Sequence, residues 1–364
     1  MSNILNFDNT VDFTKQPLFF GEGLNIQRYD NFKYKKFYQS FLNQIGFFWR
    51  PEEVHLGGKE KNDFNSLSEH ERFIFTSNLK YQILLDSVTA RGMKYIMENL
   101  SNPELEASMT WWGAFEQLHS YSYTYIIKNV YPNPSDIFDH ILDDKEIIKR
   151  ATSVTKYYDD MINGLSTDTL KEKKKKLYLA LVSINILEGV RFYVSFACSY
   201  CFAQNKKMEG NAKIISLINR DENLHLGMSQ AILKILRTDE SEGFVKIAEE
   251  CEEMVYQMYM DAATEEEDWA IYLFDRKDGT GMLGLNAEIL IKYMKWLTNR
   301  RLRGIGLKHI FDGTSNPIPW MSNFTESKDV QVAPQETEIT SYKSGAYIQD
   351  MEEHDWGSEF EGLI

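Results

Sequence analysis

Apolar and aromatic side chains recur at helical spacing along most of the chain, whereas runs that alternate between apolar and polar residues are few. This spacing favours helices over strands. Several of the predicted helices exceed about 25 residues, which suits a bundle better than a small globule. We predict an all-α fold with helices at about 30–47, 68–100, 102–130, 144–163, 168–205, 211–236, 240–273 and 285–304.

Two of the predicted helices begin with capping signals. Ser68 and Glu71 have the spacing of a capping box, in which each side chain bonds to the other residue's backbone N–H. Asn102 precedes Pro103, so it supplies a cap, and the proline occupies the first helical turn. We expect this second helix to end at the Tyr-Pro-Asn-Pro run of residues 131–134, because proline cannot continue a helix.

The regular pattern fades near residue 315. We therefore expect residues 1–315 to form one helical domain with an N-terminal arm, and residues 316–364 to form an extended, partly disordered tail. The end of this tail is acidic but finishes with Phe360, Leu363 and Ile364. A polar segment with an apolar tip cannot fold alone. Two interpretations stay open, namely terminal disorder and a docking peptide that orders on a partner.

The composition narrows the classes of function. The chain has 364 residues with 54 acidic and 40 basic side chains, a net charge of −14, which argues against a nucleic-acid-binding surface. We see no secretory signal and no stretch of about 18 uncharged apolar residues, so no membrane span is expected. Three cysteines, an odd and low number, do not suggest a disulfide scaffold, and we expect a reducing cytoplasm.

The candidate chemistry begins with two Glu-x-x-His pairs, Glu116 with His119 and Glu222 with His225. Three-residue spacing on a helix places both side chains on one face, so a carboxylate oxygen and an imidazole nitrogen can bind one metal. One pair is common by chance. Two pairs within apolar helices are more telling, because ionised groups are rarely buried unless they are paired or metal-bound. Two facing pairs supply half of a ferritin-like dinuclear site.

Two further acids stand alone in apolar helices. Asp86 is the only acid in residues 72–97, and Glu188 is the only acid in residues 177–202. Either could be a satisfied buried carboxylate. Together with the two pairs, however, they give four carboxylates and two imidazoles, the ligand set of a dinuclear centre. Oxygen-rich ligation with one imidazole per metal suits iron or manganese better than structural zinc, and the ligand types do not choose among two iron ions, two manganese ions and a mixed pair.

Tyr123 lies seven residues after Glu116 and four after His119, so it shares their helix face. A tyrosine beside an oxygen-activating metal pair is a candidate one-electron donor. The alternative is a core tyrosine with a satisfied hydroxyl, which must hold for most of the 20 tyrosines of the chain.

Two other motif matches are set aside. Residues 279–284 (GTGMLG) match a dinucleotide-binding pattern, but they follow a predicted helix rather than a strand, so we expect a turn. Cys198 and Cys201 have C-x-x-C spacing inside an apolar helix, where buried packing is expected rather than redox or zinc chemistry.

From about Phe20 to about Tyr347, the chain resembles the small subunit of class I ribonucleotide reductases of the bacterial and phage type. The resemblance is carried by residues 47–53 (FFWRPEE), 79–82 (LKYQ), 84–86 (LLD), 119–120 (HS), 122–124 (SYT), 187–188 (LE), 191–196 (RFYVSF), 220–222 (RDE), 225 (H), 316–320 (NPIPW) and 330–336 (VQVAPQE).

This resemblance implies a ferritin-like helical bundle with a dinuclear metal site in its core, and a homodimer. It also implies a function, in which the metal centre, O2 and an electron donor generate a radical at Tyr123 that passes to the large subunit for reduction of ribonucleotides to deoxyribonucleotides. The implied metal ligands are Asp86, Glu116, His119, Glu188, Glu222 and His225.

Other implied roles concern shielding and transfer of the radical. Trp49 and Asp221 would link His119 to the transfer path, and Tyr342 in the tail would pass the radical to the large subunit, where the C-terminus docks. The implied apolar pocket around the radical is Phe192, Phe196 and Ile218.

Two positions leave alternatives open. Tyr121 stands where many bacterial relatives have Arg, which raises the question of whether it is also oxidised. The tail contains both Tyr342 and Tyr347, and we favour Tyr342 because its Ser341-Tyr342 context matches better. Two other classes of function also compete, another ferritin-like diiron oxidase acting on its own substrate and a metal-free helical scaffold. The oxidase interpretation gives no role to Trp49, the NPIPW segment or the tail.

Overall fold

The computed structural model describes residues 5–164, 167–275 and 281–325. Over these residues the secondary structure is helical, and β-pairing is limited to two isolated bridges. The fold is therefore all-α, as predicted. The α-helices are α1 (Lys35–Gly46), α2 (Gly58–Ser66), α3 (Glu69–Met97), α4 (Pro103–Val130), α5 (Ser135–Phe138), α6 (Lys145–Gly164), α7 (Leu170–Ile186), α8 (Tyr193–Gln204), α9 (Glu209–Thr238), α10 (Val245–Phe274), α11 (Ala287–Gly304) and α12 (Ser322–Thr325).

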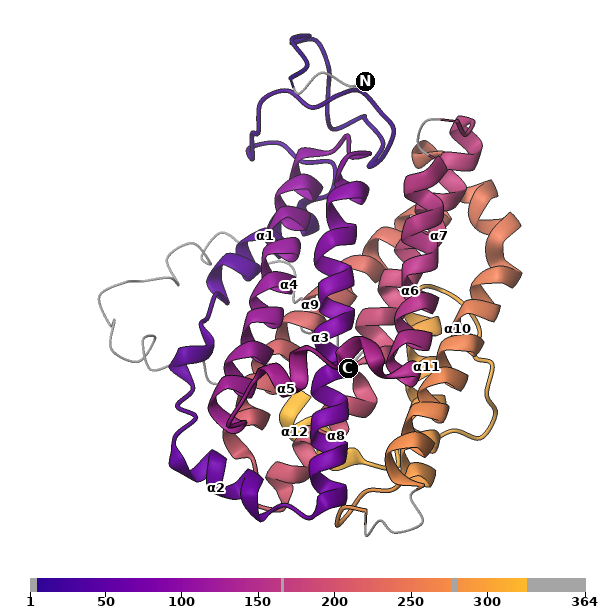
Figure 1. Ribbon diagram of the computed structural model, residues 1–364. Coiled ribbons are helices and arrows are strands. Elements are labelled where there is room, and N and C mark those ends of the chain that lie inside the picture. The colour runs from indigo at the N-terminus through magenta and orange to yellow at the C-terminus, as the bar shows by residue number, and fades with distance from the viewer. Residues whose placement is uncertain (1–4, 165–166, 276–280, 326–364) are drawn as a thin grey trace.

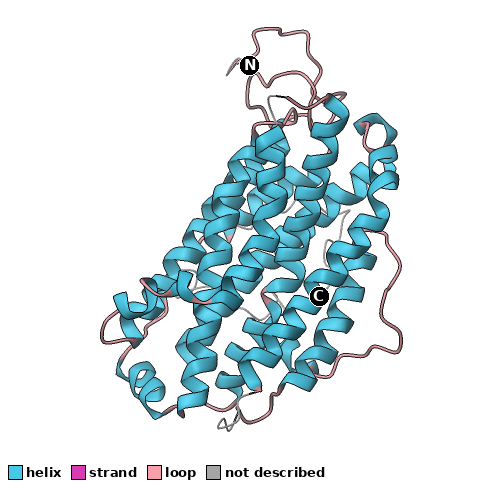
Figure 2. Cartoon of the chain, turned by 45° about the vertical axis from the view of Figure 1, so that its right-hand side comes forward, coloured by secondary structure: helices cyan, strands magenta, loops and turns pink. Residues whose placement is uncertain are grey.

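The long helices lie side by side and form a bundle, with the N-terminal segment at one end (Figures 1 and 2). Helix α3 packs on α4, α4 on α9, α9 on α8, and α8 on α3. These four helices therefore surround a common interior. Helices α6, α7, α10 and α11 extend the bundle on one side. Helix α6 packs on α3, α7 packs on α9, and α10 packs on both α7 and α11.

The predicted capping signals are confirmed. The Ser68 hydroxyl accepts a hydrogen bond from the Glu71 backbone N–H at 3.1 Å, and the Glu71 carboxylate accepts one from the Ser68 N–H at 2.8 Å. Asn102 accepts from the backbone N–H of Leu105 at 2.9 Å. Helices α3 and α4, which carry half of the candidate ligands, thus begin where local side-chain chemistry dictates.

Helix α2 was not predicted, because Phe64 is the single large apolar residue in its sequence. A tertiary contact replaces the missing local signal. The buried Glu60 carboxylate accepts hydrogen bonds from the backbone N–H groups of Gly210 (3.1 Å) and Asn211 (2.7 Å) in the first turn of α9. Helix N-termini attract negative charge, so this contact stabilises both helices. The first helix also begins at Lys35 rather than near residue 30.

The single helix predicted at 168–205 is interrupted by a π-helical turn, Leu187–Arg191. An α-helical repeat cannot reveal this insertion, because residues 177–186 and 193–202 on either side of it are buried on every face. Such turns are rare and often mark functional sites. Glu188 lies inside this one.

The stretch Leu170–Gln204 contains one window that is apolar and long enough to cross a membrane. The expectation concerned uncharged stretches of about 18 residues, and here the uncharged run is interrupted by Glu188 and Arg191. The whole window is buried in the protein, so a position at the centre of the bundle accounts for its apolar character. Cys198 and Cys201 lie in the same stretch as free, buried thiols, and burial raises the pKa of Cys201 to about 12.

The GTGMLG segment lies partly outside the described residues. Its described glycines, Gly281 and Gly284, have φ values of 65° and 94°, a region that favours glycine, and they form a turn before α11.

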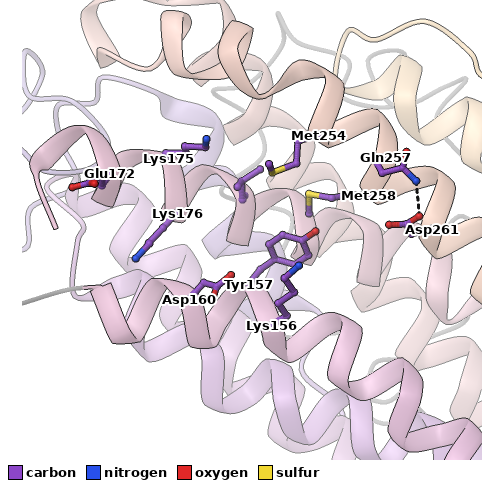
Figure 3. A pocket seen from close by; sticks show the side chains of 11 residues that line it. Lys156, Tyr157, Asp160, Glu172, Lys175, Lys176, Met254, Gln257, Met258 and Asp261 are labelled. Atoms are coloured by element: carbon purple, nitrogen blue, oxygen red, sulfur yellow. Dashed lines mark hydrogen bonds between the residues drawn. The ribbon is translucent and has the colours of Figure 1, made fainter. Parts of the chain in front are cut away.

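A groove of about 510 Å³ opens between α6, α7 and α10 (Figure 3). Its lining includes Tyr157, Met254 and Met258, and none of the candidate metal ligands.

The described part of the predicted tail packs on the bundle. Ile318 and Met321 are buried, and the ring of Phe324 stacks on Tyr200 with centroids 4.8 Å apart. Tyr342 and Tyr347 lie outside the described residues. The division at residues 315 and 316 stays a prediction.

A buried cluster of charge joins α10 to its neighbours. Glu266 is fully buried and accepts a hydrogen bond from the Tyr81 hydroxyl at 2.5 Å. The guanidinium of Arg191 lies 3.8 Å from the same carboxylate. Burial raises the pKa of Glu266 to about 7, although Arg150 and Arg191 oppose the shift.

This raised pKa predicts a pH-dependent cost. Protonated Glu266 contributes its full stability to the folded state below pH 4.5, the ordinary pKa of the group. This contribution to the unfolding free energy is lost as the pH rises to about 7. Relative to Glu266→Gln, which cannot ionise, the metal-free wild type should lose up to about 3 kcal/mol of unfolding free energy over that range. Urea denaturation of both proteins at pH 4.5 and 7.5 measures the difference, and parallel pH profiles would contradict it.

Candidate metal centre

The structure brings all six candidate ligands together in the interior between α3, α4, α8 and α9, and none is exposed. Their potential ligand atoms form two overlapping groups, each spanning no more than 4.8 Å. Glu116 and Glu222 belong to both groups, so their carboxylates can bridge two ions. Each group also contains one imidazole. The first group is Asp86, Glu116, His119 and Glu222, and the second is Glu116, Glu188, Glu222 and His225.

Both imidazoles turn the same nitrogen toward the shared carboxylates. His119 Nδ1 lies 3.0 Å from a Glu222 oxygen. His225 Nδ1 lies 2.9 Å from the other Glu222 oxygen and 3.1 Å from Glu116. Three-residue spacing on α4 and α9 produces this arrangement, because it aligns each Glu with its His on the inner face of the helix.

The unpaired oxygens of the cluster fit a cation. Both carboxylate oxygens of Asp86 and both of Glu188 are buried without a hydrogen-bond partner. Buried carboxylates of this kind are costly, and a bound cation would supply the missing interaction. The donor set is rich in oxygen, with one nitrogen for each group, and this chemistry suits iron or manganese.

Without a cation, the buried charges shift each other's protonation. Burial, followed by the charges of neighbouring carboxylates, raises the pKa values of Asp86 and Glu188 well above their usual range. Burial alone would also raise the pKa of Glu222, but His119 holds it below its ordinary value. Burial alone would lower the pKa of His119, but Glu222 and then Asp221 raise it well above its ordinary value. Metal binding should therefore release protons.

Trp112 supports the cluster, a contact that the sequence analysis did not assign. Its indole N–H donates to Glu116 at 2.8 Å, and its ring stacks on His225 with centroids 4.8 Å apart. The signal was present in the sequence, because Trp112 precedes Glu116 by four residues and so shares its helix face.

A chain of polar contacts leads outward from the centre. His119 Nε2 lies 3.3 Å from Asp221 Oδ2, and the indole N–H of Trp49 donates to the same oxygen at 2.7 Å. Trp49 is fully buried, but its neighbour Phe48 is 55% exposed. Arg220 fixes this corner by donating to the backbone carbonyl of Phe47 at 2.6 Å. The predicted contacts therefore join the cluster, through His119 and Asp221, to Trp49, whose neighbour in the chain, Phe48, is exposed.

Tyr123 is fully buried, and its hydroxyl has no hydrogen-bond partner. Burial and then the Asp86 carboxylate raise its pKa well above the ordinary value. Tyr121 is different, because it is 47% exposed and donates a hydrogen bond to Glu52.

The three predicted pocket residues lie in the same core cluster as Tyr123. Phe192, Phe196 and Ile218 are fully buried, and the two phenylalanine rings stack with centroids 5.7 Å apart. Their direct contact with Tyr123 stays a prediction.

The fold and this cluster define the chain as a ferritin-like helical bundle with a metal site in its core. Comparisons with known proteins agree. The family model of the ribonucleotide reductase small chain matches residues 27–317. The chain is 46% identical to the ribonucleoside-diphosphate reductase 1 subunit beta of Escherichia coli O157:H7, over 94% of this chain and 96% of that protein.

Two further relatives extend the comparison. The subunit beta of Enterobacteria phage T4 is 39% identical over 97% of each chain. The solved ribonucleotide reductase R2 subunit from Clostridium botulinum has a TM-score of 0.77 at 27% identity, covering 85% of this chain and 94% of that one. The chain belongs to the ribonucleotide reductase small-chain family and is the small subunit of a ribonucleoside-diphosphate reductase. The scaffold and separate-oxidase alternatives are set aside.

The buried charge predicts opposite effects of Glu188→Gln on the metal-free and metal-loaded protein. The raised pKa of Glu188 destabilises the metal-free fold at neutral pH, a cost that Gln lacks, so the metal-free variant should melt at a higher temperature than the wild type. The same change removes a ligand oxygen, so the rise in melting temperature on adding Mn²⁺ should shrink. Calorimetry with and without Mn²⁺ measures both effects, and the exposed Glu249→Gln serves as control. A variant that melts lower without metal would contradict this account.

Proposed function

We propose that this small subunit uses a dinuclear metal centre and O2 to generate a tyrosyl radical at Tyr123, which the large subunit then uses to reduce ribonucleotides. The observation that carries the proposal is the pair of overlapping ligand groups that share Glu116 and Glu222. A single-ion site would need no such sharing. Tyr123 lies in the same buried core, where its hydroxyl has no hydrogen-bond partner and the Asp86 carboxylate raises its pKa.

The proposed ligands divide between two ions. Asp86 and His119 would hold one ion, Glu188 and His225 the other, and the shared carboxylates would bridge them. When bound, such a metal pair supplies the oxidising power by reacting with O2 and an electron donor. We propose two iron ions, with manganese as the alternative, because both accept this ligand set.

The protein's part is to keep the radical in a dry site. A phenol that loses an electron also releases its proton. Among the carboxylates of the cluster, Asp86 has the largest effect on the pKa of the Tyr123 hydroxyl. The Tyr123 ring is inaccessible to solvent, as are Phe192, Phe196 and Ile218. We propose that these apolar side chains exclude water and reductants and so prolong the life of the radical.

The proposed exit follows the polar contacts from His119 through Asp221 to Trp49. As a small subunit, the chain works with the large subunit of the reductase. We propose that Tyr342 continues the transfer in the tail, that the C-terminal segment docks on the large subunit, and that the small subunit is a homodimer. The three cysteines are free and buried, which supports a reducing cytoplasm.

The first test concerns the radical. After anaerobic loading with Fe²⁺ and exposure to O2, the wild type should show a tyrosyl signal in electron paramagnetic resonance, and Tyr123→Phe should lose it while retaining its iron. Tyr200→Phe is the matched control, because Tyr200 is equally buried but stacks on Phe324 outside the cluster. Tyr121→Phe tests the second tyrosine. A persistent signal in Tyr123→Phe would reassign the radical, and a protein without bound metal would remove the proposal.

The second test concerns the tail. Tyr342→Phe should keep the radical yield of the wild type but lose nearly all nucleotide reduction with the large subunit, because only the transfer step is broken. Tyr347→Phe is the matched control and should retain turnover. The reverse pattern would make Tyr347 the relay, and full turnover in both variants would exclude a tail tyrosine from the path.

A further inference from the structure

The Glu188 carboxylate, like that of Asp86, lacks the side-chain support that Glu116 and His119 have. Trp112 donates to Glu116, and Asp221 lies against His119. Both oxygens of Glu188, in contrast, have no hydrogen-bond partner. Its place in the cluster is therefore set by the backbone that carries it, the π turn Leu187–Arg191.

Arg301 of α11 grips the middle of this π turn. Its Nε–H donates to the backbone carbonyl of Gly189 at 2.9 Å, and its guanidinium lies over the Tyr193 ring, 5.0 Å from the centroid. Arg301 is itself 1% exposed. A buried arginine bonded to a backbone carbonyl next to a candidate ligand fixes that backbone more firmly than apolar packing would, because the hydrogen bond is directional and charge-assisted.

The approach is close enough that any side chain at position 189 would force its neighbours to move. A Cβ atom there would lie 2.9 Å from Leu226 and 3.1 Å from the side chain of Arg301. The side chains of Leu226 on α9 and Arg301 on α11 therefore press directly on the backbone of the π turn. This contact leaves little room for the turn to shift.

Arg191 ties the end of the same turn to two other helices. One of its terminal nitrogens bonds to Glu265 on α10 at 2.8 Å, and the other donates to Ser153 on α6 at 3.0 Å. Together, the two buried arginines connect the five residues of the turn to α6, α10 and α11. A π turn is strained relative to a regular helix and tends to relax unless its surroundings hold it.

We propose that Arg301 and Arg191 are positioning residues that hold the π turn and, through it, place the Glu188 carboxylate in the dinuclear centre. The proposal rests on the proposed metal function. Arg301 bonds to the Gly189 carbonyl, and Arg191 bonds to Glu265 and Ser153 rather than to a candidate ligand, so their proposed effect on metal binding is indirect. Outer residues that orient a ligand in this way commonly change metal affinity by about 10–100-fold when they are lost.

The test combines metal binding with backbone exchange. In Arg301→Met, Mn²⁺ titration should show one of the two ions bound about 10–100-fold more weakly. Amide hydrogen exchange of the metal-free protein should be faster across residues 187–193. Arg301→Lys keeps the positive charge and one donor, so it should recover part of both properties. Arg237→Met removes a half-buried arginine that pairs with Glu252 instead, and it should behave as the wild type.

The outcomes separate the proposals. Glu188→Gln should weaken one ion without speeding exchange across residues 187–193, which distinguishes a lost ligand from a misplaced one. Wild-type metal affinity and exchange in Arg301→Met would overturn the positioning role. If that variant does not fold, Arg301→Lys and Arg191→Lys decide by the same two measurements. A wild-type protein that binds no Mn²⁺ and no Fe²⁺ would overturn the proposed function, and the exchange rates alone would then show whether Arg301 holds the turn.

Discussion

The structure depends on the burial of four carboxylates and two imidazoles at one point in an apolar core. In a metal-free interior, such a group of charges is unfavourable, because each carboxylate loses its hydration and repels the others. Burial and repulsion raise the pKa of Glu188, whereas His119 holds the pKa of Glu222 below its ordinary value. The fold tolerates the arrangement because α3, α4, α9 and the π turn each contribute groups, and the rest of the core, which includes Trp112 and Phe196, is large.

Much of this could be predicted from the sequence, because the relevant signals are local. The caps Ser68 and Asn102 mark where α3 and α4 begin. The Glu-His pairs on α4 and α9 follow from their three-residue spacing. Asp86 and Glu188 stood out as single acids in apolar helices. The structure places all six ligand candidates together, although their role as ligands stays a proposal.

The features that the sequence did not reveal depend on contacts between distant residues. Helix α2 forms around the bonds of Glu60 to the backbone of α9, which lies 150 residues later in the chain. The π turn has no periodic signature in a segment that is buried on every side, and the arginine that grips it is 112 residues away. The extra residue changes which way Glu188 points. A regular helix over residues 168–205 identifies Glu188 as a candidate ligand but predicts the wrong direction for its side chain.

Tyr121 and Tyr123 show that position on a helix alone can give two identical side chains different environments. They share one side-chain chemistry and lie two residues apart, which on a helix turns them in different directions. Tyr123 faces the buried carboxylates with its hydroxyl unpaired, whereas Tyr121 faces solvent and bonds to Glu52. A radical at the exposed position would meet water and reductants. The same rotation that brings Glu116 and His119 inward therefore favours Tyr123 over Tyr121 as the site of the proposed radical.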